Sequence, residues 1–288
     1  MHNAMLAHSV AHEVFQEKKK AGKVRGKFGI KIDGQPGVAM DPTSAADKEA
    51  LKRHYAFEFW EVAPLVNGSY NEVMRNKLGD RLPKFTTEES KRMANSYDFI
   101  AFDAYTSAWV GGLEGEEDGG AGCGADSDFY PSCVNASNYN NEGYLIGKPT
   151  QSTWNFLANS SVYDGLKYMH QNGVKAFTVG ENGMAIRNDS QLLLGARVAD
   201  ADRVDWYRST FKNIKWVLDE KMPLIGFSAW SCINNLEWSG GYKIKFGLID
   251  ANPGSNQPRT PKSSAHYVRQ VMTGQIHSQP PYFAEAGI

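Results

Sequence analysis

The chain is poor in cysteine, has no long apolar run and carries almost no excess of charge. It contains 3 Cys in 288 residues, and 31 Lys and Arg stand against 32 Asp and Glu, for a net charge of −1. No stretch reaches the roughly 18 apolar residues that a membrane-spanning helix needs. Balanced charge gives no electrostatic reason to expect nucleic acid or an anionic membrane as a partner. We therefore expect an uncharged small-molecule partner.

Motifs for metals and phosphates are missing too. The 7 His form no His-Glu-x-x-His motif or other ligand-spaced cluster, and the Cys lack the second pair typical of a zinc site. The glycine-rich stretch VGGLEGEEDGGAGCGAD at 110–126 is long and acidic, and no helix pattern follows it, unlike a phosphate-binding loop. We expect no metal and no cofactor.

The cysteines and the glycosylation sequons favour secretion. Cys123 and Cys133 bracket a Gly-, Asp- and Ser-rich loop and are candidates for a disulfide, whereas Cys232 is expected to be a buried thiol. N-x-S sequons begin at Asn67, Asn135, Asn159 and Asn188, although a chain this rich in Asn and Ser contains some by chance. No export signal is visible at the start of the sequence. Secretion is the prediction.

Helix and strand patterns alternate along the chain without a linker, so we expect one domain over residues 1–288. Leu6, Val10 and Val14 recur at helical spacing and predict a first helix that ends in a basic run. Further helices are predicted near 44–59, 162–171, 202–220 and 263–272, with strands near 27–32, 97–105, 175–181 and 223–230. Thr86 and Glu89 form a capping box that opens another helix. This alternation predicts a parallel sheet, either doubly wound or closed into a barrel.

Residues 110–150 form a long Gly-, Asp- and Asn-rich stretch with little periodicity. Loops of this length are usually either functional or mobile. We expect the stretch to lie on the rim of the active site.

Two segments place a carboxylate near the end of a predicted strand. In KAFTVGENG, at 175–183, Glu181 stands where an apolar strand gives way to a glycine turn, and parallel α/β folds build active sites at such strand ends. The local pattern alone is more often an ordinary turn. In PLIGFSAWSCINNLEW, at 223–238, Glu237 lies among Trp residues, which suits stacking on a sugar and binding its hydroxyls. Together the segments predict a carbohydrate site.

The motif VGENG resembles the nucleophile motif of glycoside hydrolase family 1, the β-glucosidase family, in which Thr usually stands at position 180. WSCINNLEWSGGYKIKFGL resembles the sugar-binding loop of the same family. Further matches occur in the family's order: HNAMLAH at 2–8, PLVNGSYNEVM at 64–74, GDRLPKFTTEES at 79–90, SYDFIAFDAYTS at 96–107 and RTPKSSA at 259–265. The resemblance covers nearly the whole chain and implies an α/β fold of the TIM (β/α)8 barrel family.

One family motif has no counterpart in this sequence. The Asn-Glu-Pro motif, which holds the acid/base Glu at the end of the fourth barrel strand, is absent, and Met1 falls where the family's fourth barrel helix begins. The resemblance therefore implies about the last four strands and five helices, without the sugar-binding Gln, His and Asn of the first four strands. An opened barrel exposes strand edges, which invite self-association, and we expect it to occur through them.

The resemblance implies retaining hydrolysis of β-glucosides, with a covalent glycosyl-enzyme on Glu181 and catalytic carboxyls about 5–5.5 Å apart. It implies that the Tyr105 hydroxyl contacts this nucleophile. Asp103 stands where Asn is common and Ala104 where an aromatic residue often sits. A second carboxylate beside Glu181 disfavours the ionised form of Glu181. We therefore expect the nucleophile to be ionised less readily than in a typical family member.

The resemblance also assigns the sugar contacts. Glu237 matches the residue that binds the outer hydroxyls of the glycone, Trp230 the stacking platform, Trp238 a hydroxyl-contacting indole and Trp154 a residue on the aglycone side. A carboxylate at position 237 repels phosphate, so we expect a neutral glycone, with glucose as the prediction. Without the acid/base, the isolated chain is expected to be weakly active or inactive; the alternative is a non-catalytic sugar-binding or interaction protein built on a half-barrel.

Overall fold

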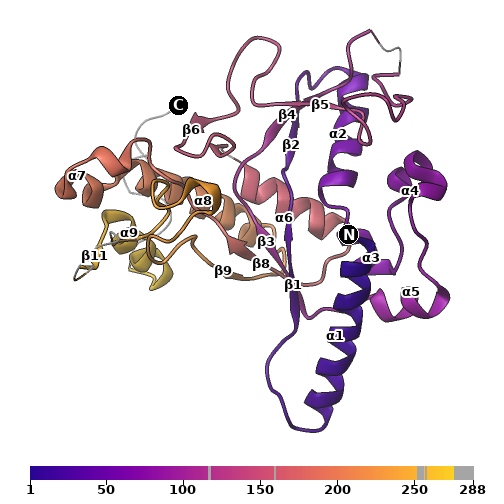
Figure 1. The fold of residues 1–288 in the computed structure, drawn as a ribbon, viewed down its shortest axis with the longest axis horizontal. Coiled ribbons are helices and arrows are strands. Elements are labelled where there is room, and N and C mark those ends of the chain that lie inside the picture. The colour runs from indigo at the N-terminus through magenta and orange to yellow at the C-terminus, as the bar shows by residue number, and fades with distance from the viewer. Residues whose placement is uncertain (116–117, 159, 252–255, 257, 276–288) are drawn as a thin grey trace.

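A four-stranded parallel sheet forms the centre of the molecule, in the order β1-β3-β8-β9 (Figure 1). The structure is a computed structural model that describes residues 1–115, 118–158, 160–251, 256 and 258–275. The strands run over Gly29–Asp33 (β1), Phe99–Asp103 (β3), Phe177–Glu181 (β8) and Leu224–Phe227 (β9). In the described part of the chain, β1 and β9 are each paired on one side only. The sheet is therefore not a closed barrel, and it matches the four barrel strands predicted from the sequence.

Helices connect the strands. They span His2–Lys20 (α1), Ala45–Glu58 (α2), Val62–Asn67 (α3), Glu72–Leu78 (α4), Thr87–Met93 (α5), Ser161–Gln171 (α6), Leu194–Ala199 (α7), Ala201–Asp219 (α8) and Ser263–Met272 (α9). All the predicted helices are present, whereas the sequence did not predict the short helices α3, α4 and α7. The capping box of α5 is confirmed, since the Thr86 hydroxyl accepts from the Glu89 amide and the Glu89 carboxylate from the Thr86 amide.

The apolar pattern of α1 was only partly informative. Its last turn carries Lys18, Lys19 and Lys20, as expected for a helix C-terminus. Val10 and Val14, however, are 44% and 46% exposed, and α1 instead buries Met5 and Ser9. The Ser9 hydroxyl accepts a hydrogen bond from Arg92 of α5. The buried face of α1 therefore includes a polar contact as well as apolar side chains.

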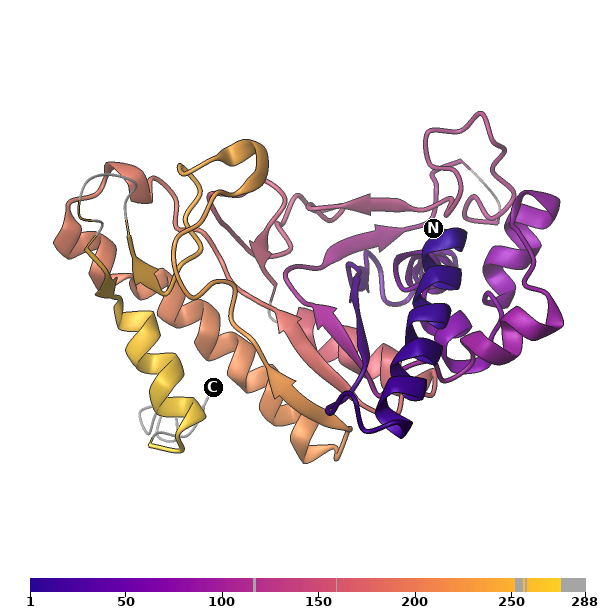
Figure 2. The ribbon, with the colours of Figure 1, turned by 60° about the horizontal axis from the view of Figure 1, so that its bottom comes forward.

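The two faces of the sheet differ because side chains alternate along each strand. Ile100 and Phe102 of β3, with Phe177 and Val179 of β8, are completely buried in the main apolar core. That core also contains Val162, Leu166 and Met169 of α6 and Val217 of α8, and both helices run along one side of the strands (Figure 2). The residues between these core positions, such as Lys31 and Ala101, belong to the opposite face.

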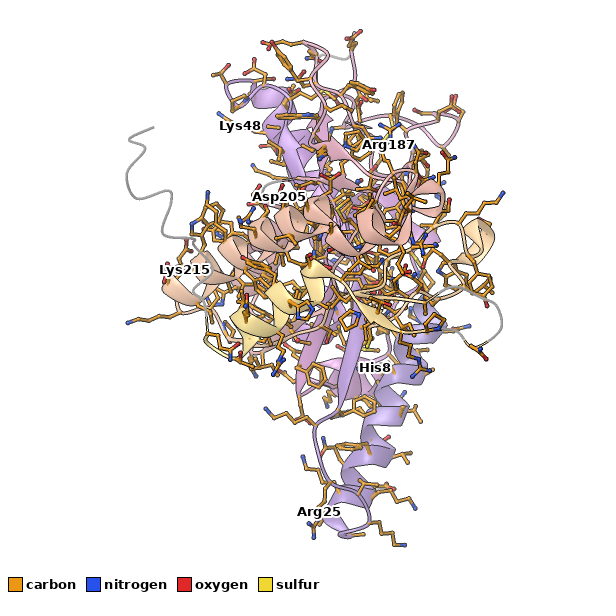
Figure 3. The ribbon with its side chains drawn as sticks, turned by 90° about the vertical axis from the view of Figure 1, so that its left-hand side faces the viewer. His8, Arg25, Lys48, Arg187, Asp205 and Lys215 are labelled. Carbon is orange, nitrogen blue, oxygen red and sulfur yellow. A yellow bond between two sulfur atoms is a disulfide. The ribbon has the colours of Figure 1, made fainter. Side chains whose placement is uncertain are left out.

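Small strands extend the molecule beyond the sheet. A three-stranded sheet joins β2 (Gly37–Ala39), β4 (Ala108–Gly111) and β5 (Asn135–Ser137), and two pairs join β6 (Lys148–Pro149) to β7 (Phe156–Leu157) and β10 (Ile249–Asp250) to β11 (Thr260–Pro261). Arg25, which precedes β1, and Lys48, near the start of α2, lie toward opposite ends of the molecule (Figure 3). The C-terminal ends of β1 and β3, which lead into β2 and β4, are therefore on the Lys48 side.

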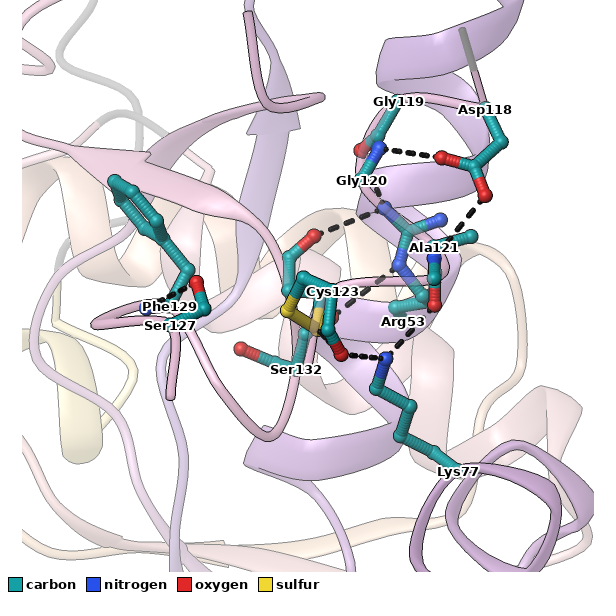
Figure 4. The surroundings of a disulfide bond; sticks show 12 residues. Arg53, Lys77, Asp118, Gly119, Gly120, Ala121, Cys123, Ser127, Phe129 and Ser132 are labelled. Carbon is teal, nitrogen blue, oxygen red and sulfur yellow. Dashed lines mark hydrogen bonds between the residues drawn. A yellow bond between two sulfur atoms is a disulfide. The ribbon is translucent and has the colours of Figure 1, made fainter. Parts of the chain in front are cut away.

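Residues 110–150 are more regular than expected, because they contain the end of β4 and all of β5 and β6. The predicted Cys123–Cys133 disulfide is present, with Cα atoms 5.8 Å apart (Figure 4). Arg53 of α2 donates to the carbonyls of Gly119, Ser132 and Cys133, and Lys77 to that of Cys123. The disulfide loop is thus tied to α2 and α4 through main-chain acceptors.

The prediction for Cys232 is wrong, because this thiol is exposed. Its neighbour Ser231 is buried instead and donates to the Ile233 carbonyl. Asn67 and Asn188 are exposed and Asn135 is half-buried in β5, while Asn159 lies outside the described residues. Among the described helices, none combines the length and apolar character needed to cross a membrane.

Candidate active site

A cleft of about 960 Å³ lies at the C-terminal ends of the strands. All six side chains singled out from the sequence line it: Tyr105, Trp154, Glu181, Trp230, Glu237 and Trp238. None of the described lining residues belongs to 110–150, and the rim position of that segment stays a prediction. A separate cavity of about 450 Å³, between the end of α3 and the start of α5, shares no residue with the cleft.

Glu181 ends β8 with both carboxylate oxygens hydrogen-bonded. The Tyr105 hydroxyl donates to Oε2 at 2.9 Å, and the Lys31 ammonium donates to Oε1 at 2.6 Å. Burial, followed by the charge of Glu181, raises the pKa of Tyr105 far above its usual range, so the phenol keeps its proton. The contact between Tyr105 and Glu181 is the one that the family resemblance implies.

Three carboxylates form a row across the strand ends. Asp33 of β1 pairs in register with Asp103 of β3, and Asp103 pairs with Glu181 of β8. Neighbouring strands lie about 4.8 Å apart, so the three charges are close. Burial raises the pKa of Asp103 to about 6, and the charge of Glu181 adds to this effect, against the hydrogen bond from Lys31. The charge of Glu181 thus acts on Asp103, while the expectation about ionisation of Glu181 itself stays a prediction.

Lys31 is the cation that sequence reasoning missed. Its ammonium lies 2.9 Å from Asp103 Oδ2 as well as 2.6 Å from Glu181 Oε1. Burial alone would lower the pKa of Lys31, but hydrogen bonds to the two carboxylates raise it to about 12. The signal was present in KFGIKID, where Lys31 alternates with Ile30 and Ile32 and so faces the same side as Asp33.

The Asn and Gly that follow Glu181 anchor the strand end. The buried Asn182 amide donates to the Ala104 carbonyl at 2.5 Å, and its oxygen accepts from Trp206 at 2.9 Å and Thr210 at 2.8 Å. A Cβ on Gly183 would lie 1.8 Å from the Trp230 carbonyl oxygen, so no side chain fits there. In the ENG triplet, Glu181 faces the cleft, Asn182 ties the end of β8 to the segment after β3 and to α8, and Gly183 lets the loop that carries Trp230 come close.

Glu237 and Trp230 form the other side of the cleft. Burial raises the pKa of Glu237, and the charge of Glu181 adds to this, while a hydrogen bond from the Trp230 indole opposes it. Trp238 is 88% exposed at the start of a 3₁₀ turn, Trp238–Gly240. Trp154 is half-exposed and packs edge-on against Tyr105, with ring centroids 5.3 Å apart. One carboxylate and three indoles thus border the space above Glu181.

A second acidic group on the β1 side was also missed. Glu58, Trp60 and Glu61, at the end of α2 and in the turn that follows it, line the cleft with Asp33. Burial raises the pKa of Glu61 to about 8, and the charges of Asp33 and Glu58 add to the rise. Glu61 therefore keeps its proton near neutral pH. The described residues include no group of three or more His, Cys, Asp or Glu placed to hold a metal ion, and the expectation of no metal or cofactor stays a prediction.

The model of glycosyl hydrolase family 1 matches residues 1–276 of this chain. The chain belongs to this family. Beta-glucosidase 42 of Arabidopsis thaliana is 32% identical over 282 residues, which cover 95% of this chain and 55% of the relative. Raucaffricine-O-beta-D-glucosidase of Rauvolfia serpentina is 29% identical over 281 residues, or 97% and 51% of the two chains.

The structures agree with the sequence comparison. A family 1 β-glucosidase of the fungus Humicola insolens, solved in complex with glucose, superposes with a TM-score of 0.85 at 29% identity. The match covers 96% of this chain and 57% of the fungal chain. The chain thus spans about half the length of the curated relatives it matches, and its fold is the corresponding part of a family 1 barrel.

Two residues that differ from the usual family 1 sequence, Gly180 and Asp103, lie next to each other. A Cβ on Gly180, where Thr is usual, would come within 2.9 Å of Asp103 Oδ1 and 3.1 Å of the Ala101 Cβ. Asp103 itself stands where Asn is common. The missing side chain at position 180 therefore leaves the room that the Asp103 carboxylate occupies beside Lys31.

Proposed function

We propose that this chain carries the nucleophile half of a retaining β-glycosidase that removes the terminal non-reducing β-D-glucosyl residue from neutral glucosides. Glu181 is the nucleophile: its carboxylate attacks the anomeric carbon and forms a covalent glycosyl-enzyme. The observation that carries the proposal is the Tyr105–Glu181 hydrogen bond at a strand end, in a cleft that also contains Trp230 and Glu237.

The sugar contacts follow from the same cleft. Trp230 offers an indole face to the apolar side of the sugar ring, and Glu237 accepts hydrogen bonds from its outer hydroxyls. Trp238, exposed in the free chain, gives a further hydroxyl contact once a sugar covers it, and Trp154 borders the aglycone. Membership of family 1 and the glucose-bound relative support a small sugar as the ligand.

Labelling with 2,4-dinitrophenyl 2-deoxy-2-fluoro-β-D-glucoside tests the nucleophile without needing an acid catalyst. A Glu181 oxygen bonds to C1 while the bond from C1 to the phenolate oxygen breaks, and the phenolate leaves with the electron pair and no proton. We expect intact mass and peptide mapping to show one sugar on Glu181, none in Glu181→Gln, and unchanged labelling in Glu13→Gln, an exposed control on α1. An unlabelled parent chain would overturn the proposal and favour a non-catalytic sugar-binding protein.

The glycone is tested separately. Because the Glu237 carboxylate repels phosphate, we expect an aryl β-glucoside to react faster than its 6-phosphate. Preference for the phosphorylated sugar would contradict a neutral glycone. We also propose that the isolated chain turns over cellobiose negligibly, because proton transfer from an acid is worth about 10²–10⁴-fold for poor leaving groups.

We further propose that the protein is secreted and associates with itself through β1 and β9. The disulfide supports secretion, because disulfides persist in oxidising compartments, and the one-sided pairing of both outer strands supports association. Cell fractionation and light scattering after gel filtration test the two claims. A chain that stays inside its cells, or a monomer at all concentrations, would contradict them in turn.

A further inference from the structure

We propose that Lys31 is a positioning residue for the nucleophile: its ammonium holds Glu181 and Asp103 together as ions and fixes the orientation in which Glu181 meets the anomeric carbon. This inference rests on the proposed function of Glu181. No family motif quoted above contains Lys31.

The contacts of Lys31 differ from those of an ordinary surface ion pair. Its side chain is 55% exposed, but the carboxylates it binds are only 10% exposed at Asp103 and 19% at Glu181. Exposed pairs contribute little to stability, because water already solvates both partners. Here the carboxylates of Asp103 and Glu181 have lost most of their contact with water. The Lys31 ammonium supplies each of them with a hydrogen-bond donor in place of water.

The route of the Lys31 side chain depends on small neighbours. Lys31 lies on β1, yet it reaches a carboxylate on β8 and so crosses β3. Its register partner on β3 is Ala101, and Gly180 of β8 lies beside Ala101 on the same face. Larger residues at these two positions would stand in the path of the lysine.

The orientation of Glu181 follows from two donors that are far apart in the sequence: Lys31 lies on β1, and Tyr105 lies in the segment just after β3. Tyr105 donates to Oε2 and Lys31 to Oε1, so the carboxylate cannot rotate without losing a hydrogen bond. Misplacing a reacting group by about 1 Å can cost on the order of 10²-fold in rate. Removing Lys31 leaves Glu181 with one donor and with the repulsion of Asp103.

The charges around the ammonium decide how the site responds to pH. The cleft residues that carry acidic or phenolic groups come from β1, the α2 end, β3, β8 and the loop after β9: Asp33, Glu58, Glu61, Asp103, Tyr105, Glu181 and Glu237. Lys31 is the one Lys or Arg among the described lining residues. Its loss leaves these acidic groups without a Lys or Arg side chain among the described lining residues, which favours their protonated forms.

The test compares Lys31→Met with Lys31→Arg, and uses Lys27→Met, an exposed lysine just before β1, as the matched control. The first readout is the ¹³C carboxyl titration of Asp103, assigned with Asp103→Asn. Its pKa of about 6 should rise in Lys31→Met and return toward the parent value in Lys31→Arg, with no change in Lys27→Met.

The second readout is the rate of Glu181 labelling by the fluoroglucoside described above. We expect Lys31→Met to label on the order of 10²-fold more slowly, with its pH profile displaced to higher pH, and Lys31→Arg to recover much of the rate. Parent-like labelling in Lys31→Met would overturn the positioning role while leaving the proposed function intact.

The two readouts separate the two claims. If the parent chain is not labelled, the proposed function fails, and the positioning role fails with it. The Asp103 titration then still decides whether Lys31 holds the two carboxylates as ions. An unchanged Asp103 titration in Lys31→Met would overturn that part independently of any reaction.

Discussion

The two faces of the central sheet contain the same strands and differ in almost everything else. On the helix side, Ile100 and Phe102 pack in a closed apolar core. On the cleft side, Ala101 is small and Asp103 is charged, although these residues alternate with the first two. One face therefore holds the fold together, and the other is free to carry charges that a core would not accept. The expected effects of substitutions should divide along the same line.

The largest expected effect on stability lies on the helix side. Phe102 is completely buried, and its ring packs against Phe59, with centroids 5.4 Å apart, and against α6 at Gly165. Replacing Phe102 by Ala should cost about 3–5 kcal/mol of unfolding free energy, because it leaves a large cavity. Urea denaturation measures the loss. Thr178→Ala, on the cleft side of β8, is the control and should cost less than about 1 kcal/mol; equal losses would remove the contrast between the faces.

The second effect is a dependence of the unfolding free energy on pH, which comes from Glu61 on the cleft side of the sheet. The pKa of Glu61 is raised to about 8 in the folded protein, whereas an unfolded Glu titrates near 4.5. The folded state binds the proton more tightly, so stability falls as pH rises from about 4.5 to 8, by on the order of a few kcal/mol.

Glu61→Gln should flatten this part of the stability curve, because its amide does not titrate. Urea denaturation of the parent and the variant at several pH values measures the difference, and Glu88→Gln, on an exposed face of α5, is the control. A parent and a Glu61→Gln protein with parallel curves between pH 4.5 and 8 would show that Glu61 is not held protonated.

The smallest expected effect comes from adding a methyl group at one of two glycines on the cleft side of the sheet. A methyl group at position 180 meets Asp103 Oδ1 at 2.9 Å, and one at position 226 meets Thr178 Oγ1 at the same distance. Both substitutions should cost about 1 kcal/mol, since the end of a side chain can move aside. Only Gly180→Ala should disturb the Asp103–Lys31 pair, and so raise the pKa of Asp103 above about 6. A shift of the same size in Gly226→Ala would mean that the effect is not local.

Much of the fold was predictable because its signals are local. The helices were visible from apolar spacing and caps, and α5 begins at the Thr86 and Glu89 box that the sequence predicted. The parallel order of the strands followed from their alternation with helices. The short helices α3 and α4 and the strand β5 were missed, because segments of a few residues are stabilised by their tertiary contacts rather than by their own pattern.

The site was predicted unevenly. Glu181, Tyr105 and Glu237 were identified because strand-end position and family motifs mark them, and the fold brings them to one cleft. Lys31 and Glu61 belong to no quoted motif. Their importance depends on neighbours from β3, β8 and the α2 end, which lie far from them in the sequence.

The sequence by itself determined the family, the parallel α/β plan and the strand-end carboxylate, because motifs and periodicity are properties of short segments. Only the tertiary structure decided which charges meet. Asp33, Asp103 and Glu181 come into one row through strand register, and Lys31 reaches two of them because Ala101 and Gly180 are small. Electrostatic energies depend on separations of a few ångströms between residues distant in the chain, and those separations exist only once the sheet has formed.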